Sequence, residues 1–407
     1  IGRDTRISGD MLEAALKAGF LSAGVDVLEA GVVPTAAVAF LTRELGAVAG
    51  AVISASHNPV EDNGIKFFGA NGYKLSDELE EEITFLVTGS LAEVSSPVGG
   101  GVGRAHPVAD AAGRYVDYAL CRVPVGACDL KVVVDCANGA AFQVAPAVLR
   151  RILPGVTAIN DRPDGLNINL GCGSTHPEAV CRAVVQTGAD LGFALDGDAD
   201  RVLACAAQGR LVDGDRIMYF LARHFQERGL LPQNTVVVTV MSNLGLRLAL
   251  AEEGIEVRQT RVGDRYVLEE LLRSGARFGG EQSGHIIHLD YNTTGDGILT
   301  MLHVLAAVAA SGRSLAELAS GMEQLPQVMT NVAVTDKAAV MTSEVLAAAV
   351  ARQERILAGQ GRVLVRPSGT EPLVRVMAEA RDEALLRRVV AELVAVVEDV
   401  DREVAQA

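Results

Sequence analysis

The sequence from residue 51 to residue 68 reads Ala-Val-Ile-Ser-Ala-Ser-His-Asn-Pro-Val-Glu-Asp-Asn-Gly-Ile-Lys-Phe-Phe. An apolar run over residues 48–53 leads into small polar residues, and Pro59 stops any regular structure from continuing. This pattern predicts a buried strand that presents the Ser56 hydroxyl in a loop at its carboxyl end, where open α/β sheets bind ligands. The alternative is a surface turn that happens to contain a serine, because Asn-Pro and Asp-Asn-Gly are common turn sequences.

A second loop carries three aspartates at alternating positions. Residues 195–201 read Leu-Asp-Gly-Asp-Ala-Asp-Arg and follow the apolar run 191–195. Carboxylates so spaced can converge on one hard cation, and without a cation their charges repel. An EF-hand calcium loop would need Gly and Glu where this chain has Arg201 and Ala207. The loop therefore predicts a Mg²⁺ site completed by an anion such as phosphate, with a solvated acidic turn as the alternative.

A third loop combines hydroxyl groups, glycine and arginine between two prolines. Residues 365–372 read Val-Arg-Pro-Ser-Gly-Thr-Glu-Pro, and Arg375 follows shortly after. Backbone N–H groups, hydroxyls and a guanidinium fork are the groups that bind a phosphate dianion. The pattern predicts a phosphate-binding loop, and a structural Ser-Gly turn is the alternative.

Four motifs, in this order along nearly the whole chain, resemble those of the α-D-phosphohexomutase superfamily, and most closely those of the phosphoglucosamine mutases. Residues 54–59 resemble the phosphoserine loop of that family and residues 196–201 its metal loop. The stretch 280–285 (Gly-Glu-Gln-Ser-Gly-His) resembles its sugar-recognition loop and 366–372 its phosphate loop. Gln282, between Glu281 and Ser283, resembles the residue at this position in the glucosamine branch of the family.

The resemblance implies a role for each matching residue. Ser56 would be the phosphorylated residue, and Asp196, Asp198 and Asp200 would hold Mg²⁺ together with a phosphate oxygen on Ser56. The substrate contacts would come from Arg201, Glu281, Ser283, Arg366, Ser368, Gly369, Thr370 and Arg375. A sugar hydroxyl must also lose a proton as it attacks, and Lys66 and His285 are the candidates for this acid–base work. The alternatives are a surface lysine on a hairpin strand and a core or loop histidine.

The implied reaction interconverts glucosamine 6-phosphate and glucosamine 1-phosphate through a phosphoserine enzyme and a bisphosphate intermediate. Hexosamine bisphosphate or glucose bisphosphate would act as activator, and the product would feed UDP-N-acetylglucosamine and cell-wall precursor synthesis. The alternatives are a mutase for mannose or glucose phosphate, a metal-dependent sugar phosphatase, and a non-catalytic sugar-phosphate-binding protein.

Composition narrows the class of protein further. The 407 residues are 49% hydrophobic and 4% aromatic, which suits α/β layers whose strands are buried on both faces. A net charge of −15 argues against nucleic acid or an anionic membrane as partner. No apolar run reaches the roughly 20 residues of a membrane span, no signal peptide is visible, and the cysteines form no Cys-x-x-Cys pair. These features predict a cytoplasmic protein and leave the oligomeric state open. The resemblance implies a small sugar phosphate as its partner.

The order of strand and helix patterns predicts the fold class. We expect three similar α/β domains, with mixed sheets sandwiched by helices around a central cleft, and a smaller α+β domain at the C-terminus. The expected boundaries are 1–122, 123–212, 213–323 and 324–407, and within the last domain one helix is expected over 338–357. The first residues read like the end of a strand already under way, so the resemblance implies that the first domain lacks an N-terminal strand, loop and helix.

Overall fold

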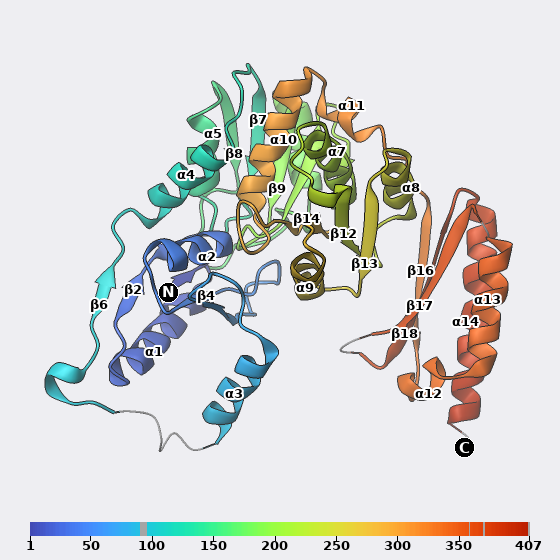
Figure 1. Ribbon diagram of the computed structural model, residues 1–407, viewed down its shortest axis with the longest axis horizontal. Helices are drawn as coiled ribbons and strands as arrows, with labels where there is room; N and C mark the ends of the chain where they lie inside the picture. The colour runs from blue at the N-terminus through green and yellow to red at the C-terminus, as the bar shows by residue number, and fades with distance from the viewer. Residues whose placement is uncertain (90–95, 358, 369–370, 406–407) are drawn as a thin grey trace. The chain divides into compact units, whose positions relative to one another are not determined.

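The computed structural model describes residues 1–89, 96–357, 359–368 and 371–405. The first sheet and its helices comprise β1 (Gly2–Arg3), α1 (Ser8–Ser22), β3 (Gly31–Val32), α2 (Thr35–Glu44), β4 (Ala49–Ile53), β5 (Ile65–Gly69) and α3 (Asp77–Thr88). The strands lie in the order β3-β1-β4-β5, and α1 and α2 both pack on β4 (Figure 1). The α2 helix is buried from Thr35 to Thr42 because its sequence there is apolar on nearly every face. A separate two-stranded sheet pairs β2 (Val27–Glu29) with β6 (Ala105–Pro107). The short 3₁₀ helix η2 (Gly99–Gly101) comes just before β6 in the chain.

The second sheet and its helices comprise α4 (Ala111–Arg122), β7 (Lys131–Asp135), α5 (Val144–Arg150), β8 (Gly155–Ile159), α6 (Glu178–Thr187), β9 (Leu191–Leu195), β10 (Val202–Ala206) and β11 (Leu211–Val212). Their strand order is β8-β7-β9-β10-β11. Every residue of β9 and β10 is buried, as expected for strands covered on both faces. The strand β9 therefore reaches the metal loop from inside the core.

The third sheet and its helices comprise α7 (Gly214–Glu227), η3 (Pro232–Asn234), β12 (Thr235–Thr239), α8 (Leu244–Glu252), β13 (Glu256–Thr260), α9 (Asp264–Ser274), β14 (Phe278–Gly280), β15 (Ile286–His288), α10 (Gly297–Ser311) and α11 (Leu315–Ala319). Helix α9 packs on β12 and β14, whereas α7 packs on both β14 and β10 of the second sheet. The second and third sheets thus share a helical layer.

The three sheets have one common plan. The orders β3-β1-β4-β5, β8-β7-β9-β10 and β13-β12-β14-β15 each contain three parallel strands followed by one antiparallel strand. In each sheet, the loop singled out from the sequence joins the third strand to the antiparallel fourth. The serine, metal and sugar loops are therefore equivalent connections, and the predicted fold class of three similar α/β domains and a smaller one is confirmed.

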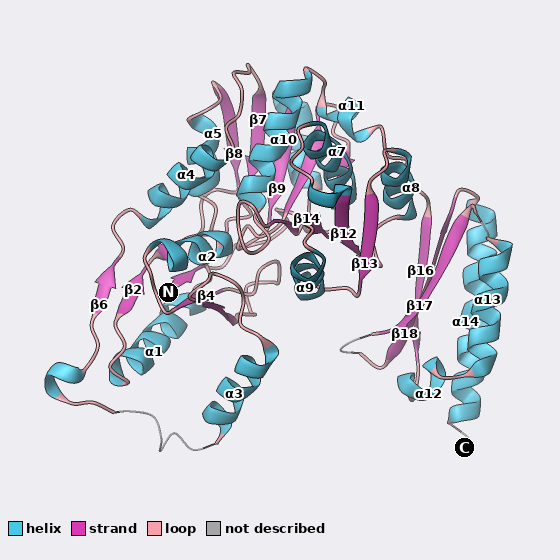
Figure 2. Cartoon of the chain, viewed as in Figure 1, coloured by secondary structure: helices cyan, strands magenta, loops and turns pink. Residues whose placement is uncertain are grey.

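The fourth domain is a three-stranded antiparallel sheet with helices packed on one face (Figure 2). Its elements are β16 (Gln327–Ala333), α12 (Lys337–Met341), α13 (Glu344–Ile356), β17 (Gly361–Pro367), β18 (Leu373–Ala380) and α14 (Glu383–Val404), with β18 in the centre. Apolar residues of α14 recur every three or four positions and pack against β16 and β18. The single helix predicted over 338–357 is wrong, because Ser343 accepts a hydrogen bond from Leu346 N and so caps a new helix.

The chain forms two compact units. One contains residues 1–242 and 250–321, and the other contains residues 243–249 and 322–407. The start of α8 belongs to the second unit because Leu244 N and the Asn243 amide both donate to the buried Glu379 carboxylate. The four domain boundaries predicted from the sequence stay predictions. In the part of the chain that the structure describes, every helix is too short or too polar to cross a membrane.

Candidate active site

Ser56 lies where the serine loop meets the metal loop. It follows β4 by three residues, is 8% exposed, and has a left-handed backbone with φ of 51°. Its hydroxyl donates to Asp196 Oδ2 at 2.7 Å, and its Oγ lies 3.3 Å from His57 Nδ1. Two loops that are far apart in the sequence thus bring a potential nucleophile into contact with a carboxylate.

The three aspartates of the metal loop converge. One carboxylate oxygen from each of Asp196, Asp198 and Asp200 lies within 4.8 Å of those of the other two, and all three residues are buried. Burial and the charges of Asp200 and Asp198 raise the pKa of Asp196 well above its ordinary value. The Oδ1 atoms of Asp198 and Asp200 are buried without a hydrogen-bond partner. Three converging carboxylates and a buried Asp198 oxygen without a hydrogen-bond partner fit a hard divalent cation such as Mg²⁺.

Cationic side chains surround this cluster. Lys66, on β5, donates to Asp198 Oδ2 at 2.9 Å and lies 3.6 Å from Asp200 Oδ2. Burial acts to lower its pKa, but the charges of Asp198 and Asp200 outweigh burial and raise it. Arg201 Nε lies 3.9 Å from Asp200 Oδ1. Lys66 lies on a hairpin strand and is partly exposed, and its ammonium faces the carboxylates.

His285 is the second candidate for acid–base work, and it is buried. Its Nδ1 lies 3.5 Å from Asp200 Oδ1, while its Nε2 has no hydrogen-bond partner. Burial acts to lower its pKa, but the Asp200 carboxylate outweighs burial and raises the pKa to about 9. Lys66, Asp200 and His285 also line one pocket of about 300 Å³, together with Asp264 at the start of α9.

The sugar loop is joined to the metal loop through the backbone. Arg201 and His285 form an antiparallel bridge, and Val202 N donates to Gly284 O. Gly284 has φ of 91°, and a Cβ there would lie 2.3 Å from Val202 O, so only glycine permits this approach. Glu281 Oε1 accepts a hydrogen bond from Gly263 N, which holds the start of α9 against the sugar loop, and Ser283 is exposed.

The phosphate loop lies in the fourth domain. Arg366 on β17 is paired in register with Arg375 on β18, and burial together with the Arg375 charge lowers the pKa of Arg366. Two guanidinium groups side by side are suited to an anion. Ser368 is buried and its carbonyl accepts from Lys337 Nζ at 2.7 Å. Gly369 and Thr370 lie outside the described residues.

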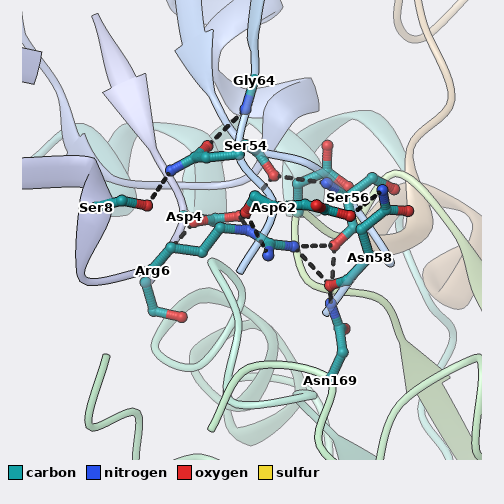
Figure 3. Close-up of polar contacts among 12 residues, drawn as sticks. Asp4, Arg6, Ser8, Ser54, Ser56, Asn58, Asp62, Gly64 and Asn169 are labelled. Carbon is teal, nitrogen blue, oxygen red and sulfur yellow. Dashed lines mark hydrogen bonds and ion pairs between the residues drawn. The ribbon is translucent and has the colours of Figure 1, made fainter. Parts of the chain in front are cut away.

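Sequence reasoning missed several polar residues that hold these loops. Thr35, at the start of α2, donates its hydroxyl to Asp198 Oδ2 at 2.7 Å, and its N–H donates to Asp198 O. Arg6 and Asn169 both donate to Ser56 O (Figure 3). Arg6 follows β1, a strand that lies parallel and next to β4, and this adjacency is seen only in the structure.

Comparisons with known proteins agree with this arrangement. Four models of the phosphoglucomutase/phosphomannomutase family match the chain: α/β/α domain I over residues 1–91, domain II over 114–209, domain III over 213–325 and the C-terminal domain over 329–396. A phosphoglucosamine mutase of Pelotomaculum thermopropionicum is 66% identical over 401 residues, covering 98% of this chain and 90% of that protein. The phosphoglucosamine mutase of Desulforudis audaxviator is 60% identical and covers 100% and 90%.

Solved structures show the same fold. A phosphoglucomutase/phosphomannomutase family protein from Burkholderia thailandensis has a TM-score of 0.80 at 25% identity, covering 98% of this chain and 88% of that one. An Aspergillus fumigatus N-acetylphosphoglucosamine mutase, solved with GlcNAc-6P and magnesium, has a TM-score of 0.68 at 21% identity, with coverages of 90% and 92%. The chain therefore belongs to the phosphoglucomutase/phosphomannomutase family, in its phosphoglucosamine mutase branch, and is a mutase of the isomerase class.

Proposed function

We propose that the reaction interconverts glucosamine 6-phosphate and glucosamine 1-phosphate, with phosphorylated Ser56 as the phosphoryl donor and acceptor. The observation that carries the proposal is the Ser56 hydroxyl at 2.7 Å from Asp196 Oδ2, next to three converging carboxylates. A mutase needs a nucleophile that can receive a phosphoryl group beside a site that neutralises the phosphate charge. Ser56 and the metal loop meet both needs.

Each residue of the site then has a defined task. Asp196, Asp198 and Asp200 would hold Mg²⁺, which when bound supplies charge neutralisation on the phosphoryl oxygens. Magnesium is supported by the buried Asp198 oxygen without a hydrogen-bond partner and by the Aspergillus enzyme, whose structure was solved with magnesium. Phosphorylated Ser56 gives its phosphoryl group to a sugar hydroxyl, and the resulting bisphosphate returns its other phosphoryl group to Ser56.

Lys66 and His285 would move the proton of the sugar hydroxyl. The raised pKa values of both favour the protonated forms, which can give a proton to the departing Ser56 or sugar oxygen. The proton of the attacking hydroxyl would pass to whichever of the two groups is neutral at that step. Arg201 would add positive charge at the transferring phosphoryl group. Lys66, Arg201 and His285 lie 3.6, 3.9 and 3.5 Å, respectively, from an Asp200 carboxylate oxygen, which supports these roles.

Substrate contacts complete the proposal. Glu281 and Ser283 would bind sugar hydroxyls, and the phosphate that is not reacting would be held by Arg366, Ser368, Gly369, Thr370 and Arg375. Hexosamine bisphosphate or glucose bisphosphate would activate the enzyme by phosphorylating Ser56. We expect the reaction to take place in the cytoplasm and to feed UDP-N-acetylglucosamine and cell-wall precursor synthesis.

The test is a comparison of turnover on three substrates. With Mg²⁺ and a bisphosphate activator, the enzyme is expected to convert glucosamine 6-phosphate with a kcat/KM well above those for glucose and mannose phosphates. Release of inorganic phosphate without isomerisation would indicate a phosphatase. Preference for glucose or mannose phosphate would instead move the chain to a different branch of the family.

A further inference from the structure

Arg6 is a fully buried arginine whose donors are nearly all directed at the serine loop. Its exposed fraction is 0%, and its Nε pairs with Asp4 Oδ2 at 2.9 Å. Its two terminal nitrogens donate to four backbone carbonyls of that loop, those of Ser56 (3.1 Å), Asn58 (2.8 Å), Asp62 (2.9 Å) and Pro59 (Figure 3). A guanidinium has five N–H donors in a fixed planar arrangement. Here these donors bind four carbonyls of the loop at the same time.

The carboxylate that pairs with Arg6 reaches Ser56 by a second path. Asp4 Oδ2 accepts from the Ser54 hydroxyl at 2.6 Å, and Ser54 Oγ in turn accepts from Ser56 N at 2.9 Å. Asp4 also accepts from Arg6 N through its Oδ1. The buried ion pair therefore contacts the backbone on both sides of Ser56, through Ser54 on the N–H side and through Arg6 on the carbonyl side.

These contacts on both sides of Ser56 restrain a backbone conformation that is unfavourable by itself. Ser56 has φ of 51°, in the left-handed region that is sterically unfavourable for a non-glycine residue. Such a conformation persists only where surrounding contacts impose it. Asn169, from the second domain, adds to the hold by donating to Ser56 O at 2.9 Å and to Asn58 O at 3.0 Å. In this conformation the Ser56 hydroxyl points to Asp196.

We propose that Arg6 is a positioning residue that fixes the backbone of Ser56 so that its oxygen stays in line for both phosphoryl transfers. This inference rests on the proposed role of Ser56. The reasoning is geometric: the nucleophile must return to one place twice in each cycle, and a displacement of about 1 Å can cost about 100-fold in rate. The side-chain hydrogen bonds of Arg6 go to Asp4 and to carbonyls of the serine loop, so Arg6 lies outside the metal ligands Asp196, Asp198 and Asp200 and outside the pocket beside them.

The test uses Arg6→Lys and Arg6→Ala. A lysine keeps the charge but cannot serve four carbonyls, so kcat should fall about 100-fold. The KM for glucosamine 6-phosphate and the Mg²⁺ dissociation constant should stay within about threefold, because their ligands are untouched. The cavity of Arg6→Ala should accept free guanidinium ion at millimolar concentration and regain part of its kcat. Amide hydrogen exchange over residues 56–64 should become faster in both variants.

The matched control is Tyr115→Phe. Tyr115 is equally buried and donates to the Asp296 carboxylate, away from the serine loop, so this variant should lose stability without losing kcat. Asn169→Gly is the milder companion, because glycine tolerates the positive φ at that position and removes only the side-chain donor. It should lower kcat about tenfold with unchanged KM, and it keeps the test decisive if the Arg6 variants do not fold.

Three results would overturn the inference. The first is a wild-type kcat in Arg6→Lys. The second is a loss of kcat in Tyr115→Phe that equals that of Arg6→Lys at the same melting temperature. The third is a wild-type enzyme that turns over without phosphate on Ser56, which would overturn the proposed function as well and is recognised from the wild type alone.

Discussion

The serine loop and the metal loop are both buried and polar, but they differ in how their polar groups are satisfied. In the serine loop, the carbonyls of residues 56, 58, 59 and 62 all receive donors from Arg6. In the metal loop, Asp198 Oδ1 is buried without a hydrogen-bond partner, and Asp200 Oδ1 faces His285 Nδ1 at 3.5 Å. The carbonyls of the first loop are satisfied within the protein, whereas the second loop keeps a buried carboxylate oxygen that is available to a cation.

This difference in hydrogen bonding indicates that the two loops contribute differently to the proposed reaction. Unpartnered buried carboxylate oxygens cost folding free energy and favour cation binding. A fully satisfied loop costs no such energy and keeps one geometry. We infer that the serine loop supplies a fixed nucleophile, while the metal loop supplies an electrostatic environment that becomes favourable on binding Mg²⁺.

Ser56→Ala should have the largest effect. Removing the hydroxyl should lower kcat by roughly 10⁴-fold or more, because the phosphoryl acceptor is lost. The melting temperature should change little, and its increase with Mg²⁺ should persist, since the three aspartates remain. Turnover above a few per cent of wild type would show that Ser56 does not carry the phosphoryl group.

Asp198→Asn should come second. An asparagine can keep the hydrogen bonds of Thr35 and Lys66 through its carbonyl and place an amide where the unpartnered oxygen lies. Affinity for Mg²⁺ should fall, and the Mg²⁺-dependent gain in stability, about 2.7 kcal/mol at 100 times the dissociation constant, should disappear at the same concentration. Isothermal titration and thermal melts measure both, with Asp161→Asn as the control. Unchanged Mg²⁺ affinity would make the loop a structural turn.

Arg366→Lys should have a moderate effect on binding. The variant keeps the charge next to Arg375 but loses the planar fork that can hold two phosphate oxygens. Steady-state kinetics should show KM for glucosamine 6-phosphate raised about tenfold, the equivalent of one charged hydrogen bond. Bisphosphate should also escape into solution more often. Arg355→Lys, an exposed arginine on α13, is the control, and an equal KM in both variants would leave Arg366 a structural residue.

The smallest effect concerns buried polar atoms outside the site. His288 and His303 have ring nitrogens without partners, and burial lowers the pKa of His288 to about 3 and that of His303 well below its ordinary value. Their folded pKa values lie below the unfolded value, so the unfolded chain binds protons first as pH falls. Stability should therefore be full above about pH 6.5 and decline below it, by about 1.4 kcal/mol per pH unit for each histidine.

His303→Leu separates this effect from general acid sensitivity. Urea unfolding between pH 7.5 and pH 5 should show a slope shallower than wild type by about 1.4 kcal/mol per pH unit, because one buried titration is removed. His176→Gln, at an exposed histidine, is the matched control. An identical slope in His303→Leu and wild type would mean that His303 does not stay neutral in the folded protein.

The loops were predictable from the sequence because their chemistry is local. Asp196, Asp198 and Asp200 lie within five residues, and the strand before Ser56 is a continuous apolar run. Arg6 was not predictable, because its partners are backbone carbonyls about 50 residues away, and a carbonyl leaves no mark on the sequence. The helix break at Ser343 was missed for another reason: apolar residues at helical spacing continue through it, so periodicity concealed the cap.

The phosphorylation state of Ser56 during turnover tests the central claim most directly. Wild-type enzyme treated with a bisphosphate activator should gain one phosphoryl group by intact-mass analysis, and fragmentation should place it on Ser56. A rapid-quench experiment with glucosamine 6-phosphate should then show that group moving to the sugar as bisphosphate, at a rate no slower than kcat. Turnover with Ser56 unmodified throughout, or with the phosphoryl group on another residue, would contradict the proposed mechanism.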